Sequence, residues 1–138
     1  MADEIMIEGI IPVAQKDVRL LLEAGYLYME LSKWTEAEEV FRGVAALVPH
    51  SEVPHMALGH LYFSRGRFSP ALKAHKKAIE LKPESAAAHA SVGETLMFLH
   101  KHKEAVAELD KARALEPDGP AGQFAQSLKE AFELGVFG

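Results

Sequence analysis

The chain has 138 residues, a formal net charge of −5 and no cysteine. A length of this order predicts one domain, and the missing cysteine excludes disulfides, thiolate chemistry and cysteine-based zinc sites. The negative charge argues against nucleic acid or an anionic membrane surface as the main partner, because both require clustered lysine and arginine. No apolar run approaches the 18 residues that a membrane span needs. Acidic residues follow Met1 where a secretory signal carries positive charge, so a cytoplasmic location is expected.

Residues 1–17 form an apolar lead-in that precedes the periodic part of the chain. It contains Ile5, Met6, Ile7, Ile10 and Ile11. A proline at position 12 would interrupt any helix there. Two interpretations stay open: a short helix packed on the first repeat, or an arm for dimerisation or partner binding. The second rests on the rule that such apolar clusters rarely stay solvated.

Residues 18–51 and 52–85 each predict a helical hairpin. Apolar residues have helical spacing from Val18 to Leu31, and a second helix is expected from Glu36 to Val48. Thr35 with Glu38 resembles a capping box at the start of that second helix. In the next period, Ser69 followed by Pro70 predicts an N-cap and a first helical residue.

Residues 86–119 predict a third hairpin, and residues 120–138 a single capping helix. Ser85 is the expected cap of a helix over 86–99, and a second helix is expected over 103–115. In the last segment Phe124, Leu128 and Phe132 lie on one helical face, and Gly135 is a candidate C-cap. A stack of repeats needs such a terminal unit to cover its open end.

Four columns of residues recur at a spacing of 34 and set the register of these hairpins. Prolines recur two residues after leucines, and glycines and alanines keep the same step. The columns are Leu47, Leu81 and Leu115; Pro49, Pro83 and Pro117; Gly25, Gly59 and Gly93; and Ala37, Ala71 and Ala105. Glycine costs about 1 kcal/mol relative to alanine inside a helix. We therefore expect each glycine to permit close approach of the second helix of its own hairpin.

These columns resemble the tetratricopeptide repeat (TPR). The second unit fits closely, through Leu58-Gly59, Tyr62, Ala71, Ala78 and Pro83, although the usual tryptophan position holds Leu21, His55 or His89. The resemblance covers residues 18–119. It implies an all-α, right-handed superhelix of three helix-turn-helix repeats with an N-terminal lead-in and a C-terminal capping helix. The first helix of each pair would line a concave groove.

The resemblance also implies which residues line that groove. They lie on the first helices, on the face away from the glycine column. The expected peptide-binding residues are Leu22, Tyr26, Met29, Val53, Met56, His60, Phe63, Ala90, Glu94 and Met97. This surface is apolar and rich in methionine, a flexible and polarisable side chain that adapts to several apolar shapes. A protein or peptide with an apolar segment is the expected partner.

Two kinds of TPR protein bear on the identity of that partner. In TPR co-chaperones, lysine, arginine and asparagine side chains hold the carboxylate tail of heat-shock chaperones. The matching positions here are Leu22, Tyr26, Ala57, Ala87 and Ser91, so no charged or amide member of that clamp is present. A small acidic chain with three repeats and an apolar groove instead resembles the bacterial type III secretion chaperones, which keep a hydrophobic segment of a translocator soluble. That resemblance implies that residues 1–17 form the contact of a homodimer.

The sequence predicts no catalytic residue, no metal site and no cofactor. His100 and His102 form an H-x-H in a turn, but a zinc site needs three or four converging ligands. There is no nucleophile elbow and no phosphate-cradling glycine loop. Two functional hypotheses remain, a peptide-binding chaperone or adaptor that uses the concave face, and an assembly subunit that self-associates through its termini. An enzyme is not expected.

Overall fold

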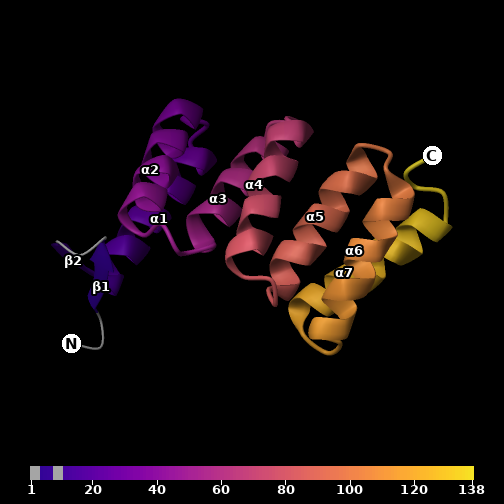
Figure 1. Ribbon diagram of the computed structural model, residues 1–138. Helices are drawn as coiled ribbons and strands as arrows, with labels where there is room; N and C mark the ends of the chain where they lie inside the picture. Colours follow the sequence, from indigo (N-terminus) through magenta and orange to yellow (C-terminus); the bar gives the residue numbers. More distant parts are fainter. Residues whose placement is uncertain (1–3, 8–10) are drawn as a thin grey trace.

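The structure, a computed structural model, describes residues 4–7 and 11–138 of the chain. Three helical hairpins are followed by a single helix. The hairpins stand side by side, and strand β1 and the carboxyl terminus lie at opposite ends of the stack (Figure 1). The elements in chain order are β1 (Glu4–Ile7), β2 (Ile11–Ala14), α1 (Gln15–Glu30), α2 (Trp34–Leu47), α3 (Val53–Ser64), α4 (Phe68–Leu81), α5 (Ala86–Phe98), α6 (His102–Leu115) and α7 (Pro120–Glu133). The predicted all-α superhelix of three hairpins with a capping helix is confirmed.

The N-terminal segment differs from the predicted short helix. Strands β1 and β2 pair antiparallel, with Glu4 opposite Ala14 and Ile7 opposite Ile11, and β2 leads directly into α1. Proline is compatible with this arrangement because a two-stranded ribbon has only edge strands. The hairpin lies at the amino-terminal end of α1 (Figure 1). The prediction of a helix here is wrong, and the predicted role in dimerisation stays a prediction.

The glycine column acts as the sequence predicted. A Cβ atom built on Gly25 would collide with the ring of Phe41, one on Gly59 with the imidazole of His75, and one on Gly93 with Leu109. Phe41, His75 and Leu109 are themselves 34 residues apart. Each hairpin is therefore closed by one glycine on its first helix and one large buried side chain on its second helix. The alanine column is fully buried beside them.

The turn inside each hairpin uses one left-handed residue at the same position of the repeat. Ser32 has φ 59°, Gly66 φ 72° and His100 φ 61°. Because the chain reverses at this residue, the second helices α2 and α4 begin earlier than predicted. Their N-cap residues are Lys33 and Arg67, and neither side chain makes a capping hydrogen bond. The predicted caps at Thr35 and Ser69 are therefore wrong. Ser85 does cap α5, accepting from the N–H of Ala88 at 3.1 Å.

Two groups of polar contacts stabilise the stack. One joins the first repeat to the second, and the other lies in the third hairpin. Between α2 and α3, the Tyr62 hydroxyl donates to Glu38 at 2.9 Å and accepts from Arg42 at 2.9 Å. In the third hairpin, buried His89 lies 2.6 Å from the Glu108 carboxylate and 2.8 Å from the carbonyl oxygen of Pro83.

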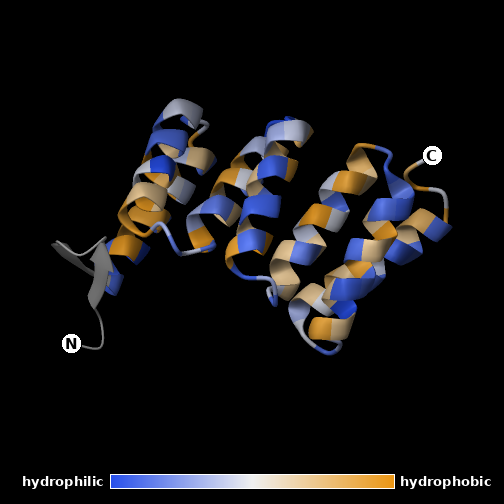
Figure 2. Ribbon diagram, viewed as in Figure 1, coloured by the Kyte–Doolittle hydropathy of each residue, from blue (hydrophilic) through white to orange (hydrophobic). Residues whose placement is uncertain are grey.

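Helix α5 is the most enclosed helix of the stack. It lies between α4 on one side and α6 and α7 on the other. Its hydrophobic residues extend along most of its length, whereas the visible faces of α4 and α6 carry many hydrophilic residues (Figure 2). This enclosure decides which residues of the third repeat reach the concave face.

Candidate functional site

A column of polar side chains recurs on the first helices of the stack, on the face that the repeat register assigns to the predicted groove. Tyr26 on α1, His60 on α3 and Glu94 on α5 are spaced by 34 residues. The Tyr26 hydroxyl lies 3.2 Å from Nδ1 of His60. This contact shows that these equivalent residues of α1 and α3 are side by side, and Glu94 occupies the same repeat position on α5. We call these three residues the polar ladder.

Apolar side chains flank the ladder and remain partly accessible. Leu22, Met29, Met56 and Phe63 are half-buried, and Val53 is 45% exposed. The ladder residue Tyr26 is 38% exposed. Isolated exposed apolar residues are normal, but a contiguous set on one face marks an interaction surface.

Two of the ten predicted groove residues are not on that surface. Ala90 is 2% exposed and Met97 is fully buried, both in a cluster with Leu109 and Ala125. Their positions face the groove in the first two repeats, but in the third repeat α6 and α7 enclose them. The prediction that Ala90 and Met97 are accessible is wrong. Glu94 stays half-buried on this helix, and the neighbouring Phe98 is 42% exposed.

His60 is the central member of the polar ladder. Its outer edge is exposed, but the surrounding side chains remove enough water to lower its pKa below the ordinary value. In the neutral tautomer with its proton on Nε2, Nδ1 accepts from Tyr26 and the Nε2–H group remains available to a ligand. Its ring lies 5.4 Å from that of His75.

His75 lies beneath the ladder and is the least hydrated histidine of the described chain. The side chain is 1% exposed, and its Nδ1 atom has no hydrogen-bond partner among the described residues. Burial, with a smaller contribution from neighbouring His60, lowers the pKa of His75 to about 3. It is therefore a neutral core residue at physiological pH and takes the place that Phe41 and Leu109 fill in the other hairpins.

Four phenylalanines form a cluster at the far end of the groove. The ring of Phe98 lies 5.1 Å from Phe63, 5.2 Å from Phe68 and 5.5 Å from Phe137. Phe137 reaches it because Gly135, with φ 82°, reverses the chain directly after α7. The C-cap residue is Leu134, one residue before the predicted Gly135. Sequence periodicity could not place Phe68 or Phe137 here, since neither lies on a first helix.

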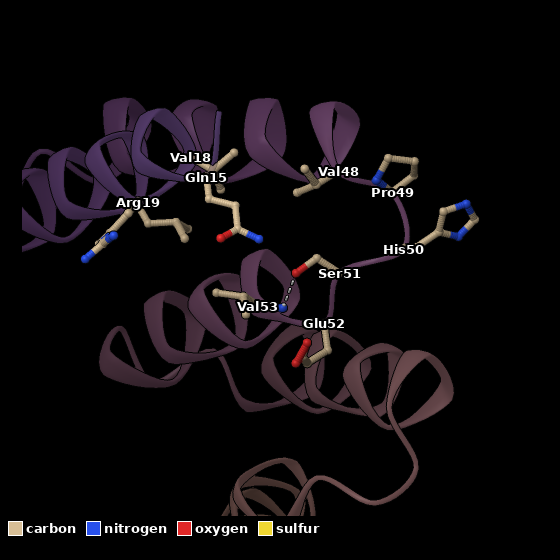
Figure 3. Close-up of a pocket in the computed structure, with 10 residues that line it drawn as sticks. Gln15, Val18, Arg19, Val48, Pro49, His50, Ser51, Glu52 and Val53 are labelled. Atoms are coloured by element: carbon tan, nitrogen blue, oxygen red, sulfur yellow. Dashed lines mark hydrogen bonds between the residues drawn. The ribbon is translucent and has the colours of Figure 1, made fainter. Parts of the chain in front are cut away.

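A pocket of about 470 Å³ lies at the other end of the groove, between α1, the end of α2 and the start of α3. Figure 3 shows Val18 and Val48 on one side of this space and Val53 on the other. The loop between α2 and α3 closes it, with Ser51 accepting from the N–H of Val53 at 3.2 Å. Leu22 and Val53 line this pocket and are also predicted groove residues, so the pocket adjoins the predicted groove.

A second hollow of about 900 Å³ lies between α2, α3 and α4, where Arg42, Lys73, Lys76 and Lys77 contribute to its wall. It contains none of the ten predicted groove residues. Within residues 4–7 and 11–138, no three histidine, aspartate or glutamate side chains converge as metal ligands. No helix in the described part of the chain is both long and apolar enough to cross a membrane.

Comparison with known proteins identifies the architecture. The family model described as TPR repeat matches residues 59–97. The structure of SycD from Yersinia enterocolitica in complex with a peptide of the translocator YopD superposes with a TM-score of 0.76 at 18% identity, over 88% of this chain and 95% of that one. PcrH in complex with the chaperone binding region of PopB gives 0.73 at 19% identity, over 86% and 96%. The first TPR of Spaghetti bound to the HSP90 peptide SRMEEVD gives 0.73 at 22% identity, over 88% and 97%. No curated protein matches the sequence.

The chain has the tetratricopeptide-repeat fold. In the TPR register, the positions of the carboxylate clamp carry Leu22, Tyr26, Ala57, Ala87 and Ser91. Ala57 is buried, and none of the five carries a positive charge. The clamp positions of this chain therefore carry apolar and hydroxyl side chains in place of the cations and amides of a carboxylate clamp.

Proposed function

We propose that this protein is a non-catalytic interaction module that binds an apolar peptide segment along its concave face. The observation that carries the proposal is the row of accessible apolar side chains beside the polar ladder. The proposed contact residues are Leu22, Tyr26, Met29, Val53, Met56, His60, Phe63 and Glu94. Three proteins of the same fold hold peptides, which supports this use of the fold.

The test is the effect of a charge placed in the groove. A displayed library of random 12-residue peptides is selected on the wild-type chain, and the enriched peptides are measured by fluorescence anisotropy. Met56→Asp should weaken their binding at least tenfold, because a buried carboxylate would have to be desolvated against an apolar ligand. Leu115→Asp is the matched control, since Leu115 is 46% exposed on α6 and absent from the proposed surface.

Circular dichroism checks whether both variants retain the helical fold. Equal loss of binding in Met56→Asp and Leu115→Asp, or full binding by Met56→Asp, would place the ligand elsewhere. A library that yields no enriched peptide would contradict the proposal itself.

We propose further that the client is the apolar segment of an exported protein, as for a type III secretion chaperone in the cytoplasm. The support is the similarity to SycD and PcrH over nearly the whole length of both chains, together with the apolar groove. The alternative of an assembly subunit is favoured by exposed apolar residues near the carboxyl terminus, Leu134 and Val136, and on α1, Leu20, Leu27 and Leu31. Phe137 does not join them, because it packs on Phe98 within the chain.

Two peptides separate this finer proposal from a co-chaperone function. The YopD peptide held by SycD should bind this chain, whereas SRMEEVD, the peptide held by Spaghetti, should not bind measurably. SRMEEVD carries three acidic residues, and the ladder meets them with Glu94 and no cation. Titration calorimetry at low salt checks both. Binding of SRMEEVD alone would reverse the assignment.

A further inference from the structure

Glu94 is an unpaired carboxylate in an apolar part of the groove. It is half-buried on α5, and the removal of water around it raises its pKa above the ordinary value. Among the described residues it forms no hydrogen bond or ion pair. A carboxylate in such a place is costly unless a partner supplies a positive charge or a donor.

Within the part of the chain that the structure describes, no lysine or arginine pairs with Glu94. Helices α3 and α5 contain no lysine or arginine. On α5, His89 is bonded to Glu108. On α7, Lys129 is bonded to Asp110 of α6 at 2.8 Å. Burial lowers the pKa of the ladder histidine, His60, which faces Tyr26 through Nδ1.

The charged residues near the predicted groove on α1 are mixed in sign. Glu23 and Glu30 are exposed there, as is Arg19, which occupies the repeat position of Val53. Within the ladder itself, Glu94 is the acidic member beside Tyr26 and His60. Charge complementarity across an interface selects the partner and suppresses ligands of the wrong sign.

We propose that the segment bound in the groove carries a lysine or arginine among its apolar residues, and that this cation pairs with Glu94. This inference rests on the proposed function, since it names the chemistry of the ligand at that site. The apolar flanks take the hydrophobic side chains of the segment, and Glu94 fixes the register in which it lies. The Nε2–H group of His60, one step along the ladder, is free to donate to a backbone carbonyl of the same segment.

The same displayed library tests the inference when it is selected separately on four proteins. Wild type and Glu39→Gln, a control at an exposed site on α2, should both enrich apolar peptides with a lysine or arginine at a fixed place. Glu94→Gln should enrich apolar peptides without that preference. Glu94→Lys should enrich peptides with aspartate or glutamate instead.

One enriched peptide is then synthesised with its basic residue and with norleucine in its place. Norleucine should weaken binding to the wild type about tenfold and leave binding to Glu94→Gln unchanged. Equal weakening for both proteins, or apolar peptides enriched without a basic residue on the wild type, would overturn the inference and leave the proposed function standing. If no peptide is enriched on any of the four proteins, the proposed function fails and this inference fails with it.

Discussion

His75→Leu should abolish most of the loss of stability that acidification causes in the wild-type chain. The buried imidazole has a pKa of about 3 in the folded chain and about 6.5 in the unfolded chain. Between these two values the unfolded state binds the proton and the folded state does not. Stability therefore falls as the pH is lowered from 6.5 towards 3, by about 1.4 kcal/mol per pH unit. Between pH 6.5 and 4.5 the loss amounts to about 2 kcal/mol, because the unfolded imidazole is already half protonated at pH 6.5.

The measurement is urea unfolding of wild type and His75→Leu at several pH values. Leucine is a suitable replacement because Leu109 fills the equivalent place against Gly93 in the third hairpin. It also removes the unpaired Nδ1 atom, so stability at pH 7 should not decrease. His50→Leu, at an exposed histidine in a loop, is the control and should keep the wild-type slope. A slope in His75→Leu as steep as that of wild type would show that another group controls the acid response.

Gly122→Ala should destabilise the chain by about 3 kcal/mol, at the upper end of what overpacking costs. A Cβ atom at position 122 would overlap the backbone carbonyl oxygen of Glu116. Backbone cannot move aside as a side chain can, so α7 would have to shift away from the end of α6. That shift would expose Ala125, Leu128 and Phe132, which cover the third repeat.

Gly43→Ala is the matched control for this substitution. Gly43 lies inside α2, is exposed, and has open space where a Cβ atom would stand. Alanine there should stabilise the chain by about 1 kcal/mol through helix propensity. Urea unfolding gives both free energies, and hydrogen exchange of the α7 amides reports whether that helix opens first. Equal free energies of unfolding for the two variants would contradict the proposed packing of α7.

The repeating columns of the sequence predicted most of the fold because each column records a contact that recurs in every hairpin. Gly59 and His75 illustrate this: their spacing relative to Gly25 and Phe41 fixes the pairing of α3 with α4. The strands at 4–7 and 11–14 could not be predicted in this way. A short apolar run has no periodicity that separates strand from helix, and the pairing of two such runs depends on partners that lie outside either run.

The site was predicted less completely than the fold. The repeat register placed Tyr26, His60 and Glu94 in one column, and it placed Met56 and Phe63 beside them. It also placed Met97 in the groove, because the register gives the position of a residue within its own repeat and does not describe the packing of neighbouring elements. Whether such a position is accessible depends on the neighbours of that repeat, and α5 has a helix packed on both sides. The phenylalanine cluster was missed for the same reason, because Phe137 joins it from beyond the repeats.

The hydrogen bond between Tyr26 and His60 joins residues that are one repeat apart. The length of the predicted groove can therefore be counted in repeats. Each additional 34 residues of sequence would add one step to the ladder and leave the existing steps unchanged, because the units of such a stack contact only their neighbours. The number of repeats, rather than the detail of any one pocket, therefore sets how long a segment can be held from end to end. A protein of this design adjusts the reach of its binding face by gaining or losing repeats, while substitutions along the ladder adjust what it accepts at each step.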